Sequence, residues 1–256
     1  MQDAFIEKII KSIKYGSTPF RYPRHFFYQW KLIFSNRPLI GELVHLSEHK
    51  KWYETIGFNT IIDVGAYIGS YALAMKTILP QATIYSFEPI QKNYEHLIKN
   101  LDGYKKFKAF NTALGDSNGN IEFWKNEFAA SSSILDIEEE HIKAFPATKM
   151  RDQIQVPISC LDEYKDEMEI IHPVLLKMDV QGYEDKVING AKQILNDVDY
   201  IITEVSFRSL YKDQPLFGDI YDHLSSLGFQ YGGNFETLLS PKDGSILQAD
   251  ALFYRA

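Results

Sequence analysis

The sequence is poor in cysteine and in long apolar runs. Cys160 is the only cysteine among 256 residues, which excludes an intrachain disulfide and a cluster of thiolate metal ligands. No run of about 18 apolar residues occurs, and residues 1–14 lack the compact apolar segment of a secretory signal peptide. We therefore expect a soluble, cytoplasmic chain, whose 45% of hydrophobic residues suffice for one sizeable core.

Net positive charge is also lacking. The 27 Lys and Arg residues stand against 34 Asp and Glu residues, and the net charge of -7 argues against nucleic acid as the main partner. Residues 1–58 differ from the rest, because they carry nine basic and five acidic residues, a net charge of +4. The sequence thus predicts a basic, aromatic, helical extension over residues 1–58 and a main domain over residues 59–256.

One segment of the extension combines aromatic and basic residues in the stretch "PFRYPRHFFYQWKLIF", residues 19–34. Such a segment can contact lipid head groups or a lipid-linked, anionic substrate. It can also form a helical collar that packs its rings on the main domain and exposes its cations, and this is the interpretation we favour. The oligomeric state is not encoded in any pattern of the sequence.

From Asn59 onward, short apolar runs alternate with amphipathic stretches. This alternation is typical of an α/β protein with a mostly parallel sheet and helices on both faces. The acidic segment 126–152 predicts a surface excursion or lid. We expect strands at residues 60–64, 82–89, 107–114, 120–125, 155–159, 172–182 and 198–207, helices at 70–79, 90–101, 183–195 and 218–229, and a closing antiparallel pair at 229–235 and 248–256.

Four of the apolar runs end in a carboxylate: Asp63, Glu88, Asp179 and Glu204. Ligands of open parallel sheets bind outside the carboxyl ends of the strands. A single acid at a strand end can simply cap a helix or solvate a loop. Four acids at four strand ends indicate a ligand site.

The loop "DVGAYIGS" narrows the choice of ligand. The loop lacks the middle glycine of the dinucleotide motif G-x-G-x-x-G, and the carboxylate of Asp63 stands before its glycines. We therefore expect it to bind a pyrophosphate poorly. The P-loop motif is missing too. Glu88 follows Gly69 by nineteen residues, near the roughly twenty expected before an acid that binds ribose hydroxyls. A nucleoside with a cationic, amine-bearing group fits, and S-adenosylmethionine is such a cofactor.

Five segments resemble FkbM-type S-adenosylmethionine-dependent methyltransferases: "IIDVGAYIGSYAL", "IYSFEP", "NTALGDSNGNIEF", "LKMDVQGYEDKVINGA" and "LLSPKDGSILQADALFYR". The resemblance covers roughly residue 59 to the C-terminus, and "FEP" and "KMDVQGYE" are its most specific parts. It implies a Rossmann-like class I methyltransferase fold with a seven-stranded sheet. It also implies O-methylation of a hydroxyl on a sugar, glycan or polyketide-type acceptor. The chain departs from the family at Gln181, where Glu is frequent.

The same resemblance implies how the cofactor is held. Glu88 is expected to accept both ribose hydroxyls through charge-assisted hydrogen bonds. The methionyl end is expected near Asp63, Gly65, Ala66 and Gly69, with Asp179 close by, the adenosine near Pro89 and Asn93, and the adenine near Ala113 and Leu114. For Ala113 and Leu114, an ordinary place in the core is an equally good interpretation.

Methyl transfer requires a base, because a neutral sugar hydroxyl is a poor nucleophile. Asp179 is the first candidate for this base, and Glu204 is the second. Either residue can instead have a structural role, such as capping a helix, and Glu184 can stabilise the first turn of its helix. A divalent metal shared by Asp179 and Glu204 is a further possibility that the sequence leaves undecided.

Other functions give different expectations. A nicotinamide-dependent oxidoreductase requires a pyrophosphate loop that this chain lacks. A non-catalytic S-adenosylmethionine-binding scaffold in glycan assembly would keep the loop and lose turnover. Methylation of nucleic acid or protein is disfavoured by the acidic main domain and by the lack of an N-P-P-[YF] segment. Specificity for the acceptor is expected in segment 126–152 and in the segment after Glu204.

Overall fold

The computed structural model describes residues 40–126, 132–138 and 151–255. Met1–Lys51 and Trp52–Ala256 form separate compact units, and both sheets lie within the second. No helix within the described ranges is long and apolar enough to cross a membrane. The helices are α3 (Ile40–Ile56), α4 (Ser70–Ile78), α5 (Gln91–Asn100), α7 (Glu184–Asn189) and α8 (Phe217–Ser226), with 3-10 helices at Leu161–Glu167 and Ile194–Asp197. The strands are β1 (Thr60–Val64), β2 (Thr83–Phe87), β3 (Phe107–Phe110), β4 (Ala113–Leu114), β5 (Gly119–Asn126), β6 (Arg151–Ser159), β7 (Val174–Met178), β8 (Tyr200–Ser206), β9 (Gln230–Leu239) and β10 (Ile246–Tyr254).

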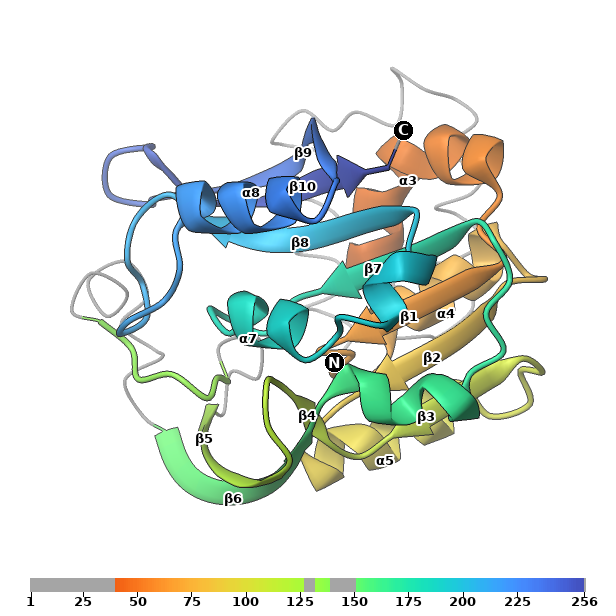
Figure 1. Ribbon diagram of the computed structural model, residues 1–256, viewed down its shortest axis with the longest axis horizontal. Coiled ribbons are helices and arrows are strands. Elements are labelled where there is room, and N and C mark those ends of the chain that lie inside the picture. The colour runs from red at the N-terminus through yellow and green to blue at the C-terminus, as the bar shows by residue number, and fades with distance from the viewer. Residues whose placement is uncertain (1–39, 127–131, 139–150, 256) are drawn as a thin grey trace, which may run out of the picture. The chain divides into compact units, whose positions relative to one another are not determined.

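Seven strands form the main sheet in the order β3-β2-β1-β7-β8-β10-β9 (Figure 1). The first five of these are parallel, and β10 runs antiparallel to β8 and to β9. The chain moves outward from β1 to β3 in one direction and from β7 to β8 in the other, so the strand order reverses between β1 and β7. The expected Rossmann-like class I methyltransferase fold is confirmed, including the closing antiparallel pair.

The two faces of the sheet carry different side chains. In Figure 1, α7 and α8 lie in front of the sheet and α4 lies behind it. Ile62 and Leu176 pack in the core cluster that includes side chains of α7 and α8. Because successive residues of a strand point to opposite faces, Asp63 and Lys177 are directed to the other face. This alternation places a buried acid next to a lysine on neighbouring strands, where the register pairs them directly.

A second sheet of three strands, in the order β4-β6-β5, was not anticipated. The expected single strand 107–114 is wrong, because β3 belongs to the main sheet and β4 to the second. Asn111 explains the break, since its Nδ2 donates to the carbonyls of Glu88 at 2.9 Å and Pro89 at 3.1 Å. Thr112 Oγ1 then donates to the carbonyl of Pro157 at 3.2 Å, which directs the chain onto β6.

Two other expected boundaries are wrong. The helix expected over 183–195 is only α7, and it ends at Gly190, where a Cβ atom would lie 1.9 Å from the carbonyl oxygen of Gly115. This close approach to the second sheet turns the chain away from the helix axis. Strand β8 does not end at Glu204 but continues to Ser206, because β10 pairs with it as far as Ser206 opposite Gln248.

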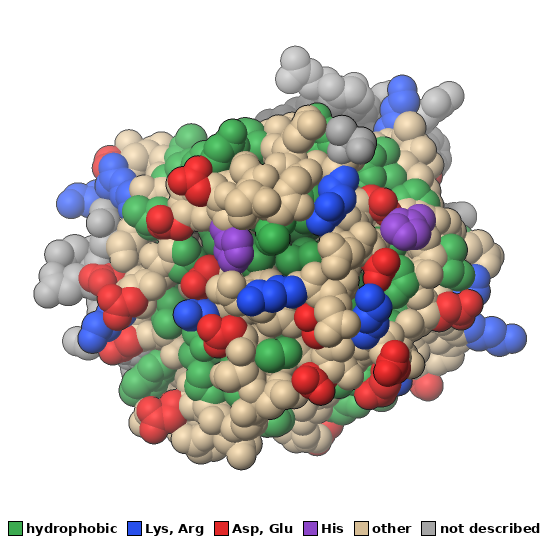
Figure 2. Space-filling view, in the orientation of Figure 1, with side chains coloured by type: hydrophobic (Ala, Val, Ile, Leu, Met, Phe, Trp, Pro, Cys, Tyr) green, Lys and Arg blue, Asp and Glu red, His purple; other side chains and the backbone are tan. Residues whose placement is uncertain are grey.

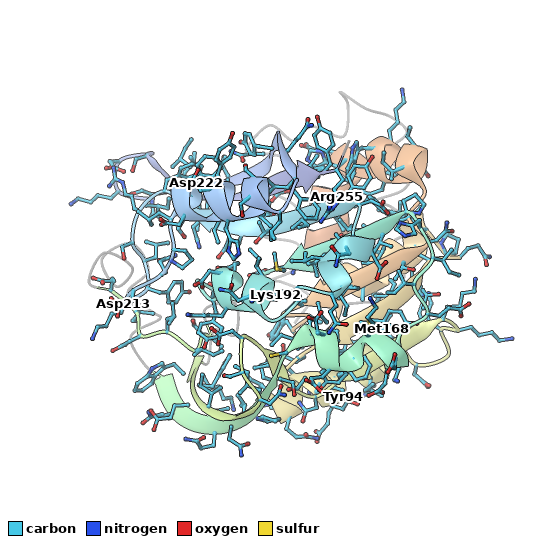
Figure 3. The ribbon with its side chains drawn as sticks, viewed as in Figure 1. Tyr94, Met168, Lys192, Asp213, Asp222 and Arg255 are labelled. Carbon is cyan, nitrogen blue, oxygen red and sulfur yellow. The ribbon has the colours of Figure 1, made fainter. Side chains whose placement is uncertain are left out.

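The end of β10 is held by Arg255, which follows the strand and is labelled in Figure 3. Its guanidinium lies 4.3 Å from the ring centroid of Phe229, and its Nη2 donates to the carbonyl of Leu195 at 3.1 Å. These contacts tie the last strand to the segments after α8 and α7. The prediction for residues 1–58 stays a prediction, because residues 1–39, including the segment 19–34, lie outside the described residues.

Candidate functional site

The loop between β1 and α4 is fixed by contacts with protein backbone. Gly65 has φ +81°, and a Cβ atom there would lie 1.9 Å from the carbonyl oxygen of Asp179. The amides of Gly65 and Ala66 both donate to the carbonyl of Phe87 at 3.0 Å. Gly69 has φ +82°, and a Cβ atom there would lie 2.5 Å from Leu97 of α5. Both glycines are thus required by neighbouring segments of the chain itself, which bring the ends of β1, β2 and β7 together.

Glu88 follows β2 and bonds the same loop. Its Oε2 accepts from the amide of Tyr67 at 3.0 Å, and its Oε1 accepts from the amide of Ile90 at 2.9 Å and from Asn93 Nδ2 at 3.2 Å. Burial raises the pKa of Glu88 to about 7, against these hydrogen bonds, which lower it. An ionised carboxylate offers about four acceptor positions. The donors among the described residues take three of these positions, which leaves one on Oε2 for a further hydroxyl.

The other residues expected near the adenosine lie around this end of β2. Asn93 contacts Glu88 directly, and Pro89 accepts a hydrogen bond from Asn111 at 3.1 Å. Ala113 and Leu114 are both buried, the first in the core of the second sheet and the second in the main core. Their packing supports the ordinary core interpretation, and their contact with adenine stays a prediction.

Asp63 is the most enclosed acid of the site. Its exposed fraction is 0%, Ser86 Oγ donates to its Oδ2 at 3.3 Å, and its Oδ1 receives no hydrogen bond from the described residues. Lys177 Nζ lies 3.7 Å from this Oδ1 and 3.5 Å from Asp179 Oδ2. Burial raises the pKa of Asp63, and the charge of Lys177 opposes part of the rise. The lysine thus links the acid at the end of β1 to the acid after β7.

Asp179 and Glu204 are brought together by glutamine side chains. Gln181 Nε2 donates to Asp179 Oδ1 at 2.8 Å and to Glu204 Oε2 at 3.1 Å. Gln248, on β10, donates to the same Glu204 oxygen at 2.6 Å. The two acids proposed as bases therefore share one amide group at the carboxyl ends of β7 and β8.

Burial raises the pKa of Glu204 well above its ordinary value. The nearby charges of Asp179, Glu184 and Asp250 add to this rise, and Lys177 opposes it. A carboxyl group whose pKa is displaced in this way by burial and neighbouring acids is typical of a functional site.

Glu184 is a buried structural neighbour of these acids. Its Oε1 accepts from the amides of Val180 at 3.2 Å and Gly182 at 3.3 Å, so it closes the turn that follows β7. Burial raises the pKa of Glu184 to about 7, although the backbone hydrogen bonds lower it. Its position favours the structural interpretation over a catalytic one.

Two segments expected to control specificity contact Gln181. The described part of the excursion, residues 132–138, contributes Ser133, whose Oγ donates to the carbonyl of Gln181 at 2.8 Å. The segment after β8, which carries Asp213 in Figure 3, contributes Tyr211, whose hydroxyl donates to Gln181 Oε1 at 2.5 Å. The two segments also pair with each other, through a bridge between Ile137 and Tyr211. The rest of the 126–152 excursion lies mostly outside the described residues.

Sequence reasoning missed four residues of this arrangement. Lys177 had a usable signal, because it lies two residues before Asp179, and alternate residues of a strand share a face. Gln248 becomes a neighbour of Glu204 only through the pairing of β10 with β8, which no local pattern specifies. Ser133 and Tyr211 lie outside regular strands and gave no signal.

The order of the main sheet, the loop after β1 and the acids at the strand ends define a protein of the class I methyltransferase type. Residues 63–231 match the family described as "Methyltransferase FkbM domain". The chain belongs to this family. S-adenosylmethionine is the cofactor that the family implies.

Relatives of known name are distant. The chain is 28% identical over 172 residues to the 2-O-methyltransferase NoeI of Sinorhizobium fredii, which covers 65% of this chain and 71% of the relative. It is 27% identical over 145 residues to the hexuronic acid methyltransferase AglP of Haloferax volcanii, which covers 56% of this chain and 54% of the relative. The chain thus spans about half the length of the second relative.

Solved structures with a similar trace are more distant still. A putative S-adenosylmethionine-dependent methyltransferase from Listeria monocytogenes has a TM-score of 0.47 and 8% identity, covering 83% of this chain and 98% of that one. Fibrillarin of Aeropyrum pernix, in complex with S-adenosyl-L-methionine, has a TM-score of 0.43 and 14% identity, covering 76% of this chain and 66% of that one.

The residues present fit S-adenosylmethionine. Glu88 keeps an open acceptor position beside the loop, as a ribose hydroxyl requires. Asp63 is fully buried beneath this loop, where its Oδ1 lies 3.7 Å from the ammonium of Lys177. An amine-bearing cationic group is the kind of partner that these acids can hold.

Proposed function

We propose that the protein is an S-adenosylmethionine-dependent O-methyltransferase whose acceptor is a hydroxyl of a sugar, a glycan or a polyketide-type molecule. One observation carries the proposal. The acid that would bind the ribose, Glu88, and the acids that would face the acceptor, Asp179 and Glu204, follow or lie near the carboxyl ends of parallel strands at one edge of the sheet. The loop that contains Gly65 contacts both Phe87, next to Glu88, and the backbone of Asp179.

The class of acceptor is supported by the relatives. The printed names of two relatives, a 2-O-methyltransferase and a hexuronic acid methyltransferase, describe methylation at oxygen in the first case and on a sugar acid in the second. Figure 2 shows Asp and Glu side chains spread among Lys and Arg side chains over the face that carries α7 and α8. Together with the net charge of -7, this surface favours a small-molecule or glycan acceptor over nucleic acid.

The bound cofactor would supply an electrophilic methyl group on a sulfonium. In the transfer, the acceptor oxygen forms a bond to the methyl carbon, the carbon–sulfur bond breaks, and its electron pair stays on sulfur. The hydroxyl proton passes to a carboxylate of the protein. Asp179 is the proposed base, because the amide of Gln181 and the ammonium of Lys177 both contact it and hold its orientation.

Glu204 is the second proposed base, because the amide of Gln181 that contacts Asp179 also contacts it. We further propose that the protein acts in the cytoplasm, in contact with a small-molecule or lipid-linked acceptor.

Transfer of radioactive methyl groups from S-adenosylmethionine to a panel of glycan acceptors tests the proposal, with and without EDTA. We expect labelled product for at least one sugar hydroxyl, and loss of labelling in Asp179→Asn at concentrations of S-adenosylmethionine that saturate the variant. Cofactor binding without labelling of any hydroxyl acceptor would instead support a non-catalytic scaffold. Labelling only of protein or nucleic acid would contradict the proposed acceptor class.

A further inference from the structure

The side chain of Gln181 makes three hydrogen bonds that fix its orientation. Its Nε2 carries two hydrogens, and these donate to Asp179 at 2.8 Å and to Glu204 at 3.1 Å. Its Oε1 accepts from the hydroxyl of Tyr211 at 2.5 Å. The opposite orientation of the amide would place its oxygen against two carboxylates, which have no proton to donate when ionised. One amide therefore satisfies both acids at the same time.

The backbone of Gln181 is also held in an unusual conformation. Its φ of +57° is left-handed, which is uncommon for a residue with a side chain. Ser133 Oγ donates to the backbone carbonyl of Gln181 at 2.8 Å and helps to hold this conformation. A strained backbone that is held by surrounding contacts is often part of a functional site. Here the strain directs one amide between two carboxylates.

We propose that Gln181 is a positioning residue of the methyl-transfer site, which sets the separation of Asp179 and Glu204 through one shared amide and leaves their remaining oxygens for the acceptor. The inference rests on the proposed function. Glu204 Oε2 is occupied by Gln181 and Gln248, whereas Glu204 Oε1 takes no hydrogen bond from the described residues. Asp179 Oδ2 is contacted by Lys177 at 3.5 Å.

A neutral donor at this position has a chemical consequence. With Glu in place of Gln181, three carboxylates would meet without a hydrogen-bond donor between them, and a group of oxygens of this kind favours a divalent cation. The amide of Gln181 donates to both acids and so links them, as a bound cation would. Unlike a cation, it adds no charge. The chain thus holds its pair of acids by hydrogen bonding.

The first test is a titration of Glu204, followed by infrared or carbon NMR spectroscopy of labelled carboxyl groups. The charged groups that face Glu204 are Asp179, Glu184, Asp250 and Lys177, and the variant Gln181→Ala replaces none of them. Because the variant removes a donor to the charged form, we expect the pKa of Glu204 to rise further, by about one pH unit.

The matched control is Gln153→Ala. Gln153 donates to the exposed Glu122 at 2.6 Å, far from the strand ends in sequence, and its removal should leave the titration of Glu204 unchanged. A merely structural role of Gln181 would lower the stability of the fold without moving this titration. An unchanged titration in Gln181→Ala would therefore overturn the proposal.

The second test separates cofactor binding from turnover. In Gln181→Ala, we expect the affinity for S-adenosylmethionine to stay within about twofold and kcat to fall by about 10-fold to 100-fold. In Gln181→Glu, Mn²⁺ measured by electron paramagnetic resonance should bind at least about 10-fold more tightly than in the natural chain.

Equal Mn²⁺ affinity, or equal kcat, would count against the positioning role. Failure of the natural chain to bind S-adenosylmethionine would overturn the proposed function instead. The titration of Glu204 would still decide the role of Gln181 in that case, because it requires neither cofactor nor acceptor.

Discussion

The substitution Glu184→Gln is expected to stabilise the protein at neutral and alkaline pH. The carboxyl group is buried, and its pKa is raised from 4.5 to about 7. A carboxyl with a raised folded-state pKa stabilises the fold only while it is protonated, so stability is lost as the pH rises from 4.5 through 7. At about 1.4 kcal/mol per pH unit, the full loss is about 3 kcal/mol, and about 2.5 kcal/mol of it falls between pH 5 and pH 8.

The amide of the variant keeps an oxygen that can accept from Val180 and Gly182, and it cannot ionise. The charge of Glu184 also repels Glu204 and raises the pKa of that residue. Removing it therefore favours the folded state as well, so both consequences of the substitution stabilise the protein. Urea unfolding at pH 5 and pH 8 measures the difference between the variant and the natural chain. We expect this difference to grow in favour of the variant by about 2.5 kcal/mol at pH 8.

The exposed acid Glu122 provides the control, because Glu122→Gln should change stability by less than about 0.5 kcal/mol at either pH. A variant Glu184→Gln that loses stability between pH 5 and pH 8, relative to the natural chain, would refute the reasoning. So would a difference that does not depend on pH.

Two further predictions follow from the contacts of β1. Gly65→Ala should lower the free energy of unfolding by more than about 3 kcal/mol, because φ at this position is +81° and the new Cβ would lie 1.9 Å from the carbonyl oxygen of Asp179. The control is Gly103→Ala, where φ is a similar +78° but no atom lies within 4 Å of the new Cβ. This change should cost about 1 kcal/mol. Equal losses of unfolding free energy would contradict this. Lys177→Met leaves Asp63 enclosed without its cation and should cost about 3 to 5 kcal/mol at pH 8, and less as the pH falls, because burial raises the pKa of Asp63 and protonation removes the unpaired charge. The double variant with Asp63→Asn should recover part of the loss, and no recovery in urea unfolding would disprove the coupling.

The main sheet was predictable because its strands are short, β-branched and buried on both faces. The runs around β1, β2, β7 and β8 each carry this pattern, and the reversal of strand order follows from the helices between them. The second sheet was not predictable. Its strand β4 has only the two residues Ala113–Leu114, and it forms because Asn111 and Thr112 bond distant carbonyls.

The acids of the site were predictable from their positions at the ends of apolar runs, but their partners were not. Sequence placed Asp179 and Glu204 at the ends of two strands; β7 and β8 are neighbouring parallel strands, and Asp179 follows β7, but Glu204 lies two residues before the end of β8. The amide that joins them comes from a left-handed residue, Gln181, and is fixed by Tyr211 from a separate segment. Side-chain contacts between segments this far apart depend on packing that local patterns do not encode.

The structure gives Gly65 and Gly69 a role that the sequence did not predict. Both glycines were expected near the methionyl end of the cofactor. In the structure, the atoms that would clash with a Cβ belong to Asp179 and to Leu97. The glycines therefore hold together the segments that carry Asp63, Glu88 and Asp179.

Calorimetric titration with S-adenosylmethionine and with NAD tests the central claim most directly, on the natural chain, on Glu88→Ala and on the exposed control Glu95→Ala. The account predicts binding of S-adenosylmethionine at about micromolar Kd, no comparable binding of NAD, and at least about 100-fold weaker binding in Glu88→Ala only. Absence of S-adenosylmethionine binding, a preference for NAD, or equal binding by Glu88→Ala would contradict it.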